Sequence, residues 1–243
     1  MEQTVVRIRT LEIGSGMPKI CVPVVGKTEK EILEGAERAK AAKPDLVEFR
    51  VDWYEEAADS KKVVALLEKL RKCLGELPVL FTFRSSREGG EAALSDGAYQ
   101  SLNEAAIASG FVDCVDVELF SGDAVVKAVV AAAHSNHVKV IASNHDFEKT
   151  PAAEELLARL QKMEALGADI PKIAVMPQSS KDVLTLLTVT ESWRETGKTP
   201  VITMSMAGEG LISRLCGEIF GSAVTFGAAG KSSAPGQIDA EEL

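Results

Sequence analysis

The sequence predicts an α/β fold, a (β/α)8 TIM barrel whose bottom is closed by an N-terminal β-hairpin. Eight short β-rich runs alternate along the chain with segments rich in Ala, Leu, Glu and Lys. Successive runs begin about 22–35 residues apart, which is the size of a βαβ unit. The length of 243 residues also suits this fold, for which about 250 residues is typical. A doubly wound parallel sheet uses the same alternation and is the alternative.

The β-rich runs are dominated by Val, Ile and Phe, which favour strands, and they cover residues 19–25, 45–52, 78–84, 112–119, 137–144, 171–177, 200–206 and 222–227. The segments between them carry apolar residues at helical three- and four-residue steps, and they cover residues 28–42, 60–74, 96–109, 124–135, 151–166, 180–195 and 211–220. Two extended segments, 4–10 and 11–14, predict the hairpin, and residues 236–243 predict only the start of an eighth helix. Because no linker or low-complexity stretch interrupts the chain, residues 1–243 are expected to form one barrel domain.

The composition is that of a globular protein with a negative charge: 46% apolar, 26% charged, and a net charge of −9. This charge argues against nucleic acid or an anionic membrane as a partner. No apolar run approaches the roughly 18 residues of a membrane span, and no secretory signal pattern opens the chain. The cysteines are scattered without CxxC spacing, which is typical of reduced thiols in a cytoplasmic protein. The three histidines have no cysteine or histidine at metal-ligand spacing beside them, so a structural zinc site is not expected.

Polar side chains share one face of several predicted strands, because successive residues of a strand point to opposite faces. In the second strand the apolar face must lie against the helices. The opposite face, which points into the barrel, carries Glu48, Arg50 and Asp52. The same alternation places Arg84 and His145 at the carboxyl ends of the third and fifth strands, and Lys172 on the interior face of the sixth.

These strand ends meet at one mouth of a barrel, where barrel enzymes keep their active sites. Each residue alone also has a structural interpretation. Lys172 could extend along its strand to water, and His145 could be a surface loop residue. The charged face of the second strand could be a buried ion-pair network. We favour a functional site because all of these residues converge on the same cavity.

Two glycine-rich loops were considered as phosphate sites. In residues 226–236, Gly230-Lys231-Ser232 matches the end of a P-loop, but Thr225 stands where the first glycine is required and Pro235-Gly236 where the helix should begin. Residues 206–214 place glycines between a strand and a helix without the GxGxxG pattern. Their amides suit a small carboxylate at a helix N-terminus better than a dinucleotide.

The segments EFRVDW, FTFRSSREGG, SNHDF, PKIAVMPQ, TMSMAGEGLISR and SSAPGQI resemble those of the type I 3-dehydroquinate dehydratase family in order and spacing. The resemblance runs from about Val5 to Gln237, and the short C-terminus is its one departure. It implies a metal-free, cofactor-free and cytoplasmic barrel lyase, usually a homodimer. The implied reaction is the dehydration of 3-dehydroquinate to 3-dehydroshikimate in the shikimate pathway of aromatic amino acid biosynthesis.

By the same resemblance, Lys172 is the Schiff-base lysine, His145 the general acid and base, and Glu88 the carboxylate that orients His145. The positions expected to hold the hydroxyls and carboxylate of the substrate are Glu48, Arg50, Arg84, Arg214, Ser233 and Gln237. The positions expected to line the pocket are Met204, Met206, Phe147, Phe226 and Ala234. Arg214 is the candidate for the carboxylate, which a guanidinium can hold bidentately, and residues 232–237 are expected to form a lid.

This chemistry explains the residue types. A protonated imine makes an adjacent C–H more acidic, and the amine must be neutral to form it, which burial favours. Histidine titrates in the range that proton transfer requires. Another Schiff-base barrel, such as a class I aldolase, remains an alternative within enzymes, although it needs a phosphate cradle after the seventh and eighth strands. A non-catalytic binder of small anions is the other alternative, and the presence of both Lys172 and His145 argues against it.

Overall fold

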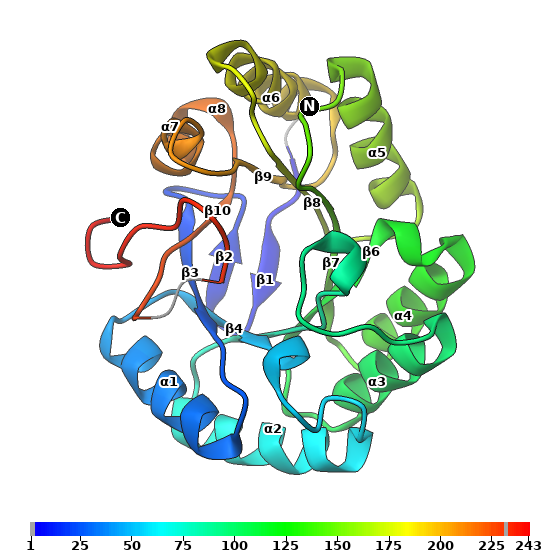
Figure 1. Cartoon of the computed structure of the whole chain (residues 1–243). Coiled ribbons are helices and arrows are strands. Elements are labelled where there is room, and N and C mark those ends of the chain that lie inside the picture. Colours follow the sequence, from blue (N-terminus) through cyan, green and yellow to red (C-terminus); the bar gives the residue numbers. More distant parts are fainter. Residues whose placement is uncertain (1–2, 231–232) are drawn as a thin grey trace.

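The computed structural model describes residues 3–230 and 233–243, and it shows a ring of parallel strands surrounded by helices (Figure 1). The strands pair in the order β10-β3-β4-β5-β6-β7-β8-β9. Their bounds are Lys19–Val24 (β3), Leu46–Arg50 (β4), Val79–Thr82 (β5), Cys114–Glu118 (β6), Lys139–Asp146 (β7), Ile170–Val175 (β8), Ile202–Ser205 (β9) and Val224–Phe226 (β10). Each β-rich run of the sequence overlaps one of these strands, so the prediction of a (β/α)8 barrel is confirmed.

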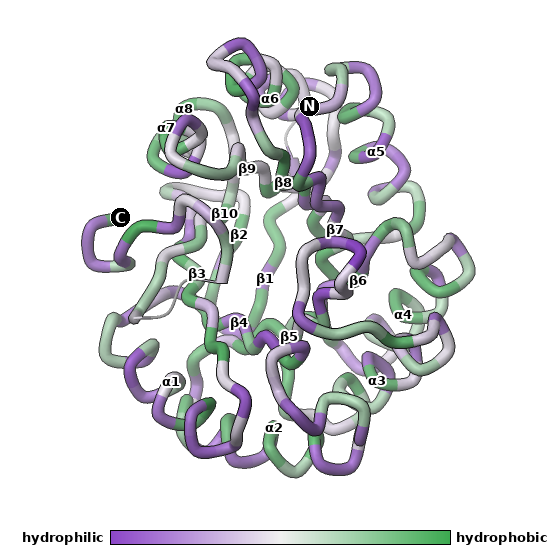
Figure 2. The backbone as a smooth tube through the Cα atoms, in the orientation of Figure 1, coloured by the Kyte–Doolittle hydropathy of each residue, from purple (hydrophilic) through white to green (hydrophobic). Residues whose placement is uncertain are grey.

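The helices between the strands are Glu29–Ala41 (α1), Ser60–Leu74 (α2), Asp96–Ala108 (α3), Asp123–Ser135 (α4), Ala153–Ala165 (α5), Ser180–Thr196 (α6), Leu211–Leu215 (α7) and Gly217–Phe220 (α8). Short 3-10 turns follow three strands: Val51–Trp53 (η1), Ser86–Glu88 (η2) and Leu119–Ser121 (η3). Side chains cap several helix starts. Thr28 accepts a hydrogen bond from the Glu31 amide, and Asp59 accepts from two amides of the first turn of α2. Green and purple alternate along the helices in Figure 2, as expected of helices with one buried face.

The barrel closes between β9 and β10 with few backbone contacts. Val201 and Ser222 form a single parallel bridge, and the Ala223 amide donates to the Val201 carbonyl at 2.8 Å. The Ser222 hydroxyl then takes the place of the next backbone pair: it accepts from the Thr203 amide at 3.0 Å and donates to the Thr203 carbonyl at 3.1 Å. A side chain thus completes the closure that the short strands leave open.

The N-terminal hairpin pairs Val6–Ile8 (β1) with Leu11–Ile13 (β2) in antiparallel register. It is seen across the centre of the barrel in Figure 1. The buried residues Val6, Ile8 and Ile13 belong to the same apolar cluster as interior strand residues such as Leu80 and Ile141. A separate, larger cluster lies between the strands and the helices. The hairpin therefore packs against the lower interior of the barrel, as predicted, and the polar residues are left to the opposite mouth.

Two expectations differ from the structure. The single helix expected over residues 211–220 is broken at Cys216 into α7 and α8. At the break, a Cβ on Gly217 would lie 2.7 Å from the Ser222 carbonyl oxygen. The backbone of residue 222 therefore leaves no room for any side chain at position 217. In the described residues after β10 no helix begins, and the Ala228–Asp239 bridge holds this segment instead. Two residues of these expectations lie outside the described residues. Lys231 and Ser232 belong to the rejected P-loop match, and Ser232 also begins the expected lid.

Candidate active site

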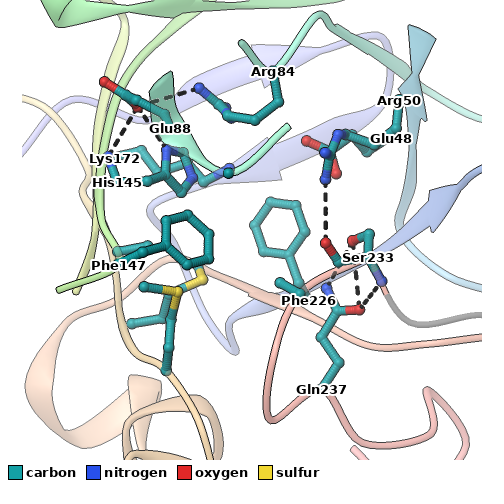
Figure 3. A pocket seen from close by; sticks show the side chains of 15 residues that line it. Glu48, Arg50, Arg84, Glu88, His145, Phe147, Lys172, Phe226, Ser233 and Gln237 are labelled. Carbon is teal, nitrogen blue, oxygen red and sulfur yellow. Dashed lines mark hydrogen bonds and ion pairs between the residues drawn. The ribbon is translucent and has the colours of Figure 1, made fainter. Parts of the chain in front are cut away.

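A pocket opens at the carboxyl ends of the strands, and side chains from β4, β7, β8, β9 and β10 enter it, together with Arg84, which follows β5 (Figure 3). The 3-10 turn η2 and the C-terminal loop contribute further residues. The lining comprises Glu48, Arg50, Arg84, Glu88, Gly89, His145, Phe147, Lys172, Ala174, Met204, Met206, Phe226, Ser233, Ala234 and Gln237. All the site residues named from the sequence are in this set except Arg214.

Lys172 lies on β8 with its side chain inside the barrel, and it is 4% exposed. Ala174 shares its face and belongs to the interior apolar cluster, while Ile173 between them packs outward against the helices. The Lys172 Nζ lies 4.4 Å from the centre of the Phe226 ring and 3.8 Å from Asp116 Oδ2. The amine is therefore fixed in an enclosed position, with one aromatic wall and one carboxylate nearby.

Asp116 and Glu118 on β6 complete an ion network that the sequence analysis missed. Arg84 donates to Asp116 Oδ1 at 2.7 Å and to Glu118 Oε1 at 3.0 Å. Ser143 donates to the same Asp116 oxygen at 2.7 Å. Burial alone would lower the pKa of Arg84, but Asp116 and Glu118 outweigh it and raise that pKa well above its ordinary value. Both acids alternate with Val115 and Val117 in the run 112–119, which is the signal that could have revealed them.

His145, at the end of β7, is paired with Glu88 of η2. The ring Nδ1 lies 3.0 Å from Glu88 Oε2, which also accepts the His145 backbone amide at 2.9 Å. Burial, together with the charges of Arg84 and Lys172, holds the pKa of His145 well below its ordinary value. In the tautomer whose Nδ1–H donates to Glu88, the neutral ring has Nε2 as its free base. Burial also raises the pKa of Glu88 to about 7, against the effect of Arg84.

Arg50 and the C-terminal loop form another wall of the pocket. Arg50 makes two hydrogen bonds of 2.8 Å to Asp52, whose oxygens also accept the backbone amides of Arg84 and Glu91. Its free end reaches the Ser233 carbonyl at 3.4 Å, so the arginine links β4 to the loop. Within the loop, Gln237 accepts the Ser233 amide at 2.9 Å and donates to the Ser233 hydroxyl at 3.1 Å. This loop therefore lines one side of the pocket, where Figure 3 shows Ser233 and Gln237.

Arg214 of α7 lies next to the pocket rather than in its lining. It is 3% exposed, and it contacts Met204 Sδ at 3.8 Å and the Pro235 carbonyl at 3.1 Å. Its Nε has no hydrogen-bond partner among residues 3–230 and 233–243, and no carboxylate of those residues forms an ion pair with it. Burial lowers the pKa of Arg214 to about 10, so it remains a cation at neutral pH. A buried guanidinium in this condition is suited to an anionic ligand.

Across the described part of the chain, no group of three or more His, Cys, Asp or Glu side chains could hold a metal ion. In the same residues, no helix has both the length and the apolar character needed to cross a membrane.

An enclosed amine, a histidine paired with a carboxylate, and a buried arginine with no acidic partner among the described residues lie together at the mouth of a barrel, and they define the class: a (β/α)8 barrel enzyme acting on a small molecule. Comparison with known proteins gives the family. The family model for type I 3-dehydroquinase matches residues 20–243. The 3-dehydroquinate dehydratase of Listeria innocua is 57% identical over 236 residues, covering 97% of this chain and 94% of the relative.

Comparison with solved structures leads to the same family. The type I 3-dehydroquinate dehydratase of Clostridium difficile, described as containing covalently modified comenic acid, superimposes with a TM-score of 0.96 at 52% identity, over 99% of this chain and 95% of that one. The enzyme of Geobacillus kaustophilus also gives a TM-score of 0.96, at 43% identity over 98% of this chain and 93% of that one. The chain belongs to the type I 3-dehydroquinase family, and it is an enzyme of the hydro-lyase class.

Proposed function

We propose that the protein dehydrates 3-dehydroquinate to 3-dehydroshikimate through a Schiff base on Lys172. The observation that carries the proposal is the enclosed Lys172 amine in the same pocket as the His145–Glu88 pair. Membership of the type I 3-dehydroquinase family supports 3-dehydroquinate as the substrate. The covalently modified ligand named for the Clostridium difficile relative supports a covalent step. We extend the proposal to a cytoplasmic homodimer that serves the shikimate pathway toward aromatic amino acids.

In the first stage Lys172 gives a proton to His145 Nε2, and the resulting neutral amine adds to the ketone carbon of the substrate, forming a C–N bond and a carbinolamine. A proton delivered by the His145 imidazolium lets the carbinolamine hydroxyl leave as water, and a protonated imine remains. This cation withdraws electrons from the adjacent carbon, whose proton becomes easier to remove. The enclosed position of Lys172, which is 4% exposed, keeps competing water away from the imine.

In the second stage His145 Nε2 removes that proton, and the electron pair moves into the ring as the imine becomes an enamine. The enamine then expels the hydroxyl on the next carbon, and the same histidine returns the proton so that water departs. One residue can serve both steps because the two groups lie on the same side of the substrate ring. Hydrolysis of the new imine releases the product and restores Lys172. Glu88 keeps the ring in the required tautomer.

The remaining polar residues are assigned to binding. Arg214 would hold the substrate carboxylate, because its guanidinium is buried and has no acidic partner in the described chain. Glu48, Arg50, Ser233 and Gln237 face the pocket and would contact hydroxyl groups. Both terminal nitrogens of Arg84 donate hydrogen bonds, to Asp116, Glu118 and Ser143. We therefore assign it two roles: it holds these acids in place, and it contacts the substrate.

Borohydride trapping tests the covalent step. Incubation with 3-dehydroquinate and sodium borohydride should attach one reduced ligand to the protein, and peptide mass spectrometry should locate it at Lys172. Lys139, which pairs with Asp169 outside the pocket, serves as an internal control and should remain unmodified. An adduct elsewhere, or none while the enone product still forms, would contradict the Schiff-base mechanism. Products of carbon–carbon cleavage would favour an aldolase instead.

Arg214→Ala should raise KM by about 100-fold, the effect of truncating a buried charged partner, with a smaller change in kcat. The reason is that this variant removes the cation assigned to the substrate carboxylate and leaves Lys172 and His145 in place. Steady-state kinetics measured by enone absorbance give both constants. Arg7→Ala is the matched control, because Arg7 lies on the hairpin and pairs with exposed Glu12. A fall in kcat at unchanged KM would contradict the assignment.

A further inference from the structure

The two oxygens of Glu88 have different partners. Oε2 serves His145, through both the ring and the backbone amide. Oε1 accepts a hydrogen bond of 3.3 Å from the side-chain amide of Asn144, which is 2% exposed. Asn144 and His145 are consecutive in β7, so their side chains leave opposite faces of the strand. Glu88 lies across the strand end and meets both, and its orientation therefore depends on Asn144 as well as on His145.

The orientation of the Asn144 amide is fixed from outside the pocket. Arg159 of α5 contacts Asn144 Oδ1 at 2.5 Å. A guanidinium can only donate, so the atom facing it must be the amide oxygen, and the NH2 group must then face Glu88. Reversing the amide would set two donors against each other at Arg159 and two oxygens against each other at Glu88. Arg159 thus determines that Asn144 donates to the carboxylate.

Arg159 is itself held in place. It forms an ion pair with Glu155 one helical turn earlier, and its guanidinium lies 5.3 Å from the centre of the Phe120 ring. Arg159 and Phe120 line a second cavity, separate from the pocket described above, which Glu88 and His145 also border. The pair is therefore contacted from two cavities, and the second one contains a fixed cation that acts on Glu88 through Asn144.

The charges around Glu88 show why this contact matters. Burial raises the pKa of Glu88, and Glu118 and Asp116 on β6 raise it further. Arg84, 3.5 Å away, and the Asn144 hydrogen bond act in the opposite direction. The other polar side chains bordering the second cavity are Arg87 and Asp146. Because these influences together place the pKa of Glu88 at about 7, a hydrogen bond to its ionised form changes the fraction of the carboxyl that is charged at neutral pH.

We propose that Asn144 and Arg159 are positioning residues, which keep the Glu88 carboxylate ionised and aligned on the His145 ring. Neither touches the substrate pocket, and their effect is transmitted through Glu88. The consequence for catalysis rests on the function proposed above, but the effect on Glu88 itself does not. An acid limb of the pH profile of kcat/KM near pH 7 is the expected kinetic sign, because activity is lost as Glu88 takes up a proton.

The test compares Asn144→Ala, Arg159→Ala and Arg159→Lys with the unmodified protein. Loss of the hydrogen bond should move the acid limb upward by about one pH unit, which makes kcat/KM at pH 6 about tenfold lower while the plateau at high pH changes little. Arg159→Lys should restore most of the effect, because lysine also donates. Lys162→Gln is the matched control, since Lys162 lies on the same helix, pairs with Asp123 and does not border the second cavity, so its loss should leave the profile in place. Thermal melting of each variant confirms folding.

A second measurement separates this inference from the proposed function. In protein labelled with 13C at the glutamate carboxyl, with the Glu88 signal assigned by Glu88→Gln, the titration of Glu88 can be followed without substrate. A Glu88 titration that is unchanged in both Asn144→Ala and Arg159→Ala would overturn the inference. A shifted titration with an unshifted activity profile would support the inference and instead contradict a catalytic role for the Glu88–His145 pair.

Discussion

Lys172→Met should reduce kcat for dehydration by more than about 10⁴-fold, as expected when the nucleophile of a covalent mechanism is removed. Methionine has a similar length and no amine, so the pocket keeps its shape but cannot form an imine. The fold should survive because Asp116, the nearby acid, retains its bonds to Arg84 and Ser143. Continuous measurement of enone absorbance, with melting curves of both proteins, checks the result.

The matched control for this variant is Lys139→Met. Lys139 also lies on a barrel strand, but it pairs with Asp169 and does not reach the pocket. Its replacement should leave kcat and KM close to those of the unmodified enzyme. If Lys172→Met were folded and kept more than a few per cent of the activity, the covalent mechanism would be wrong, whatever the trapping experiment showed.

The alternation of side chains along the strands explains how much of the pocket could be predicted. Val47 and Phe49 pack in the outer core, whereas Glu48 and Arg50 are buried in the pocket, as the pattern of residues 46–50 requires. The same rule gave His145 and Lys172. It works here because each strand separates two different environments, so the polar side chains must take the face that the helices do not cover.

The partners of these side chains were harder to predict, because they depend on distances between strands. Asp116 and Glu118 occupy interior positions of β6, and the run 112–119 predicts their strand but not that both acids pair with Arg84. Arg84 was accordingly assigned to substrate alone, whereas the structure shows it bound to these two acids. No rule of periodicity reports such a contact between β5 and β6.

Residues outside the strands show the same limit. The contacts of Arg214 with Met204 and with the Pro235 carbonyl had no signal in the sequence. The break between α7 and α8 also has no periodic signal, and neither has the close approach of Gly217 to the Ser222 carbonyl. Contacts of this kind form between segments that the sequence separates, so they become visible only in three dimensions.

His145→Ala should lower kcat by about 10³-fold, within the range that general acid–base catalysis contributes, while borohydride trapping at Lys172 becomes slower but is not abolished. The difference arises because Lys172 can still add to the ketone in this variant. Proton removal, however, has lost its base, and departure of the hydroxyl has lost its acid. Single-turnover kinetics, which separate imine formation from product release, measure the two effects. The variant also leaves Glu88 without its ring partner, so its melting temperature must be recorded.

His134→Gln is the matched control, because His134 pairs with Asp169 at an exposed position far from the pocket lining. It should leave both stages unchanged. The proposal assigns the mobile proton to His145 rather than to Glu88, since Glu88 Oε2 already accepts two hydrogen bonds and points at the ring rather than at the cavity of Lys172. If His145→Ala kept full turnover while Glu88→Gln lost it, the carboxylate would be the base, and the direction of proton transfer proposed here would have to be reversed.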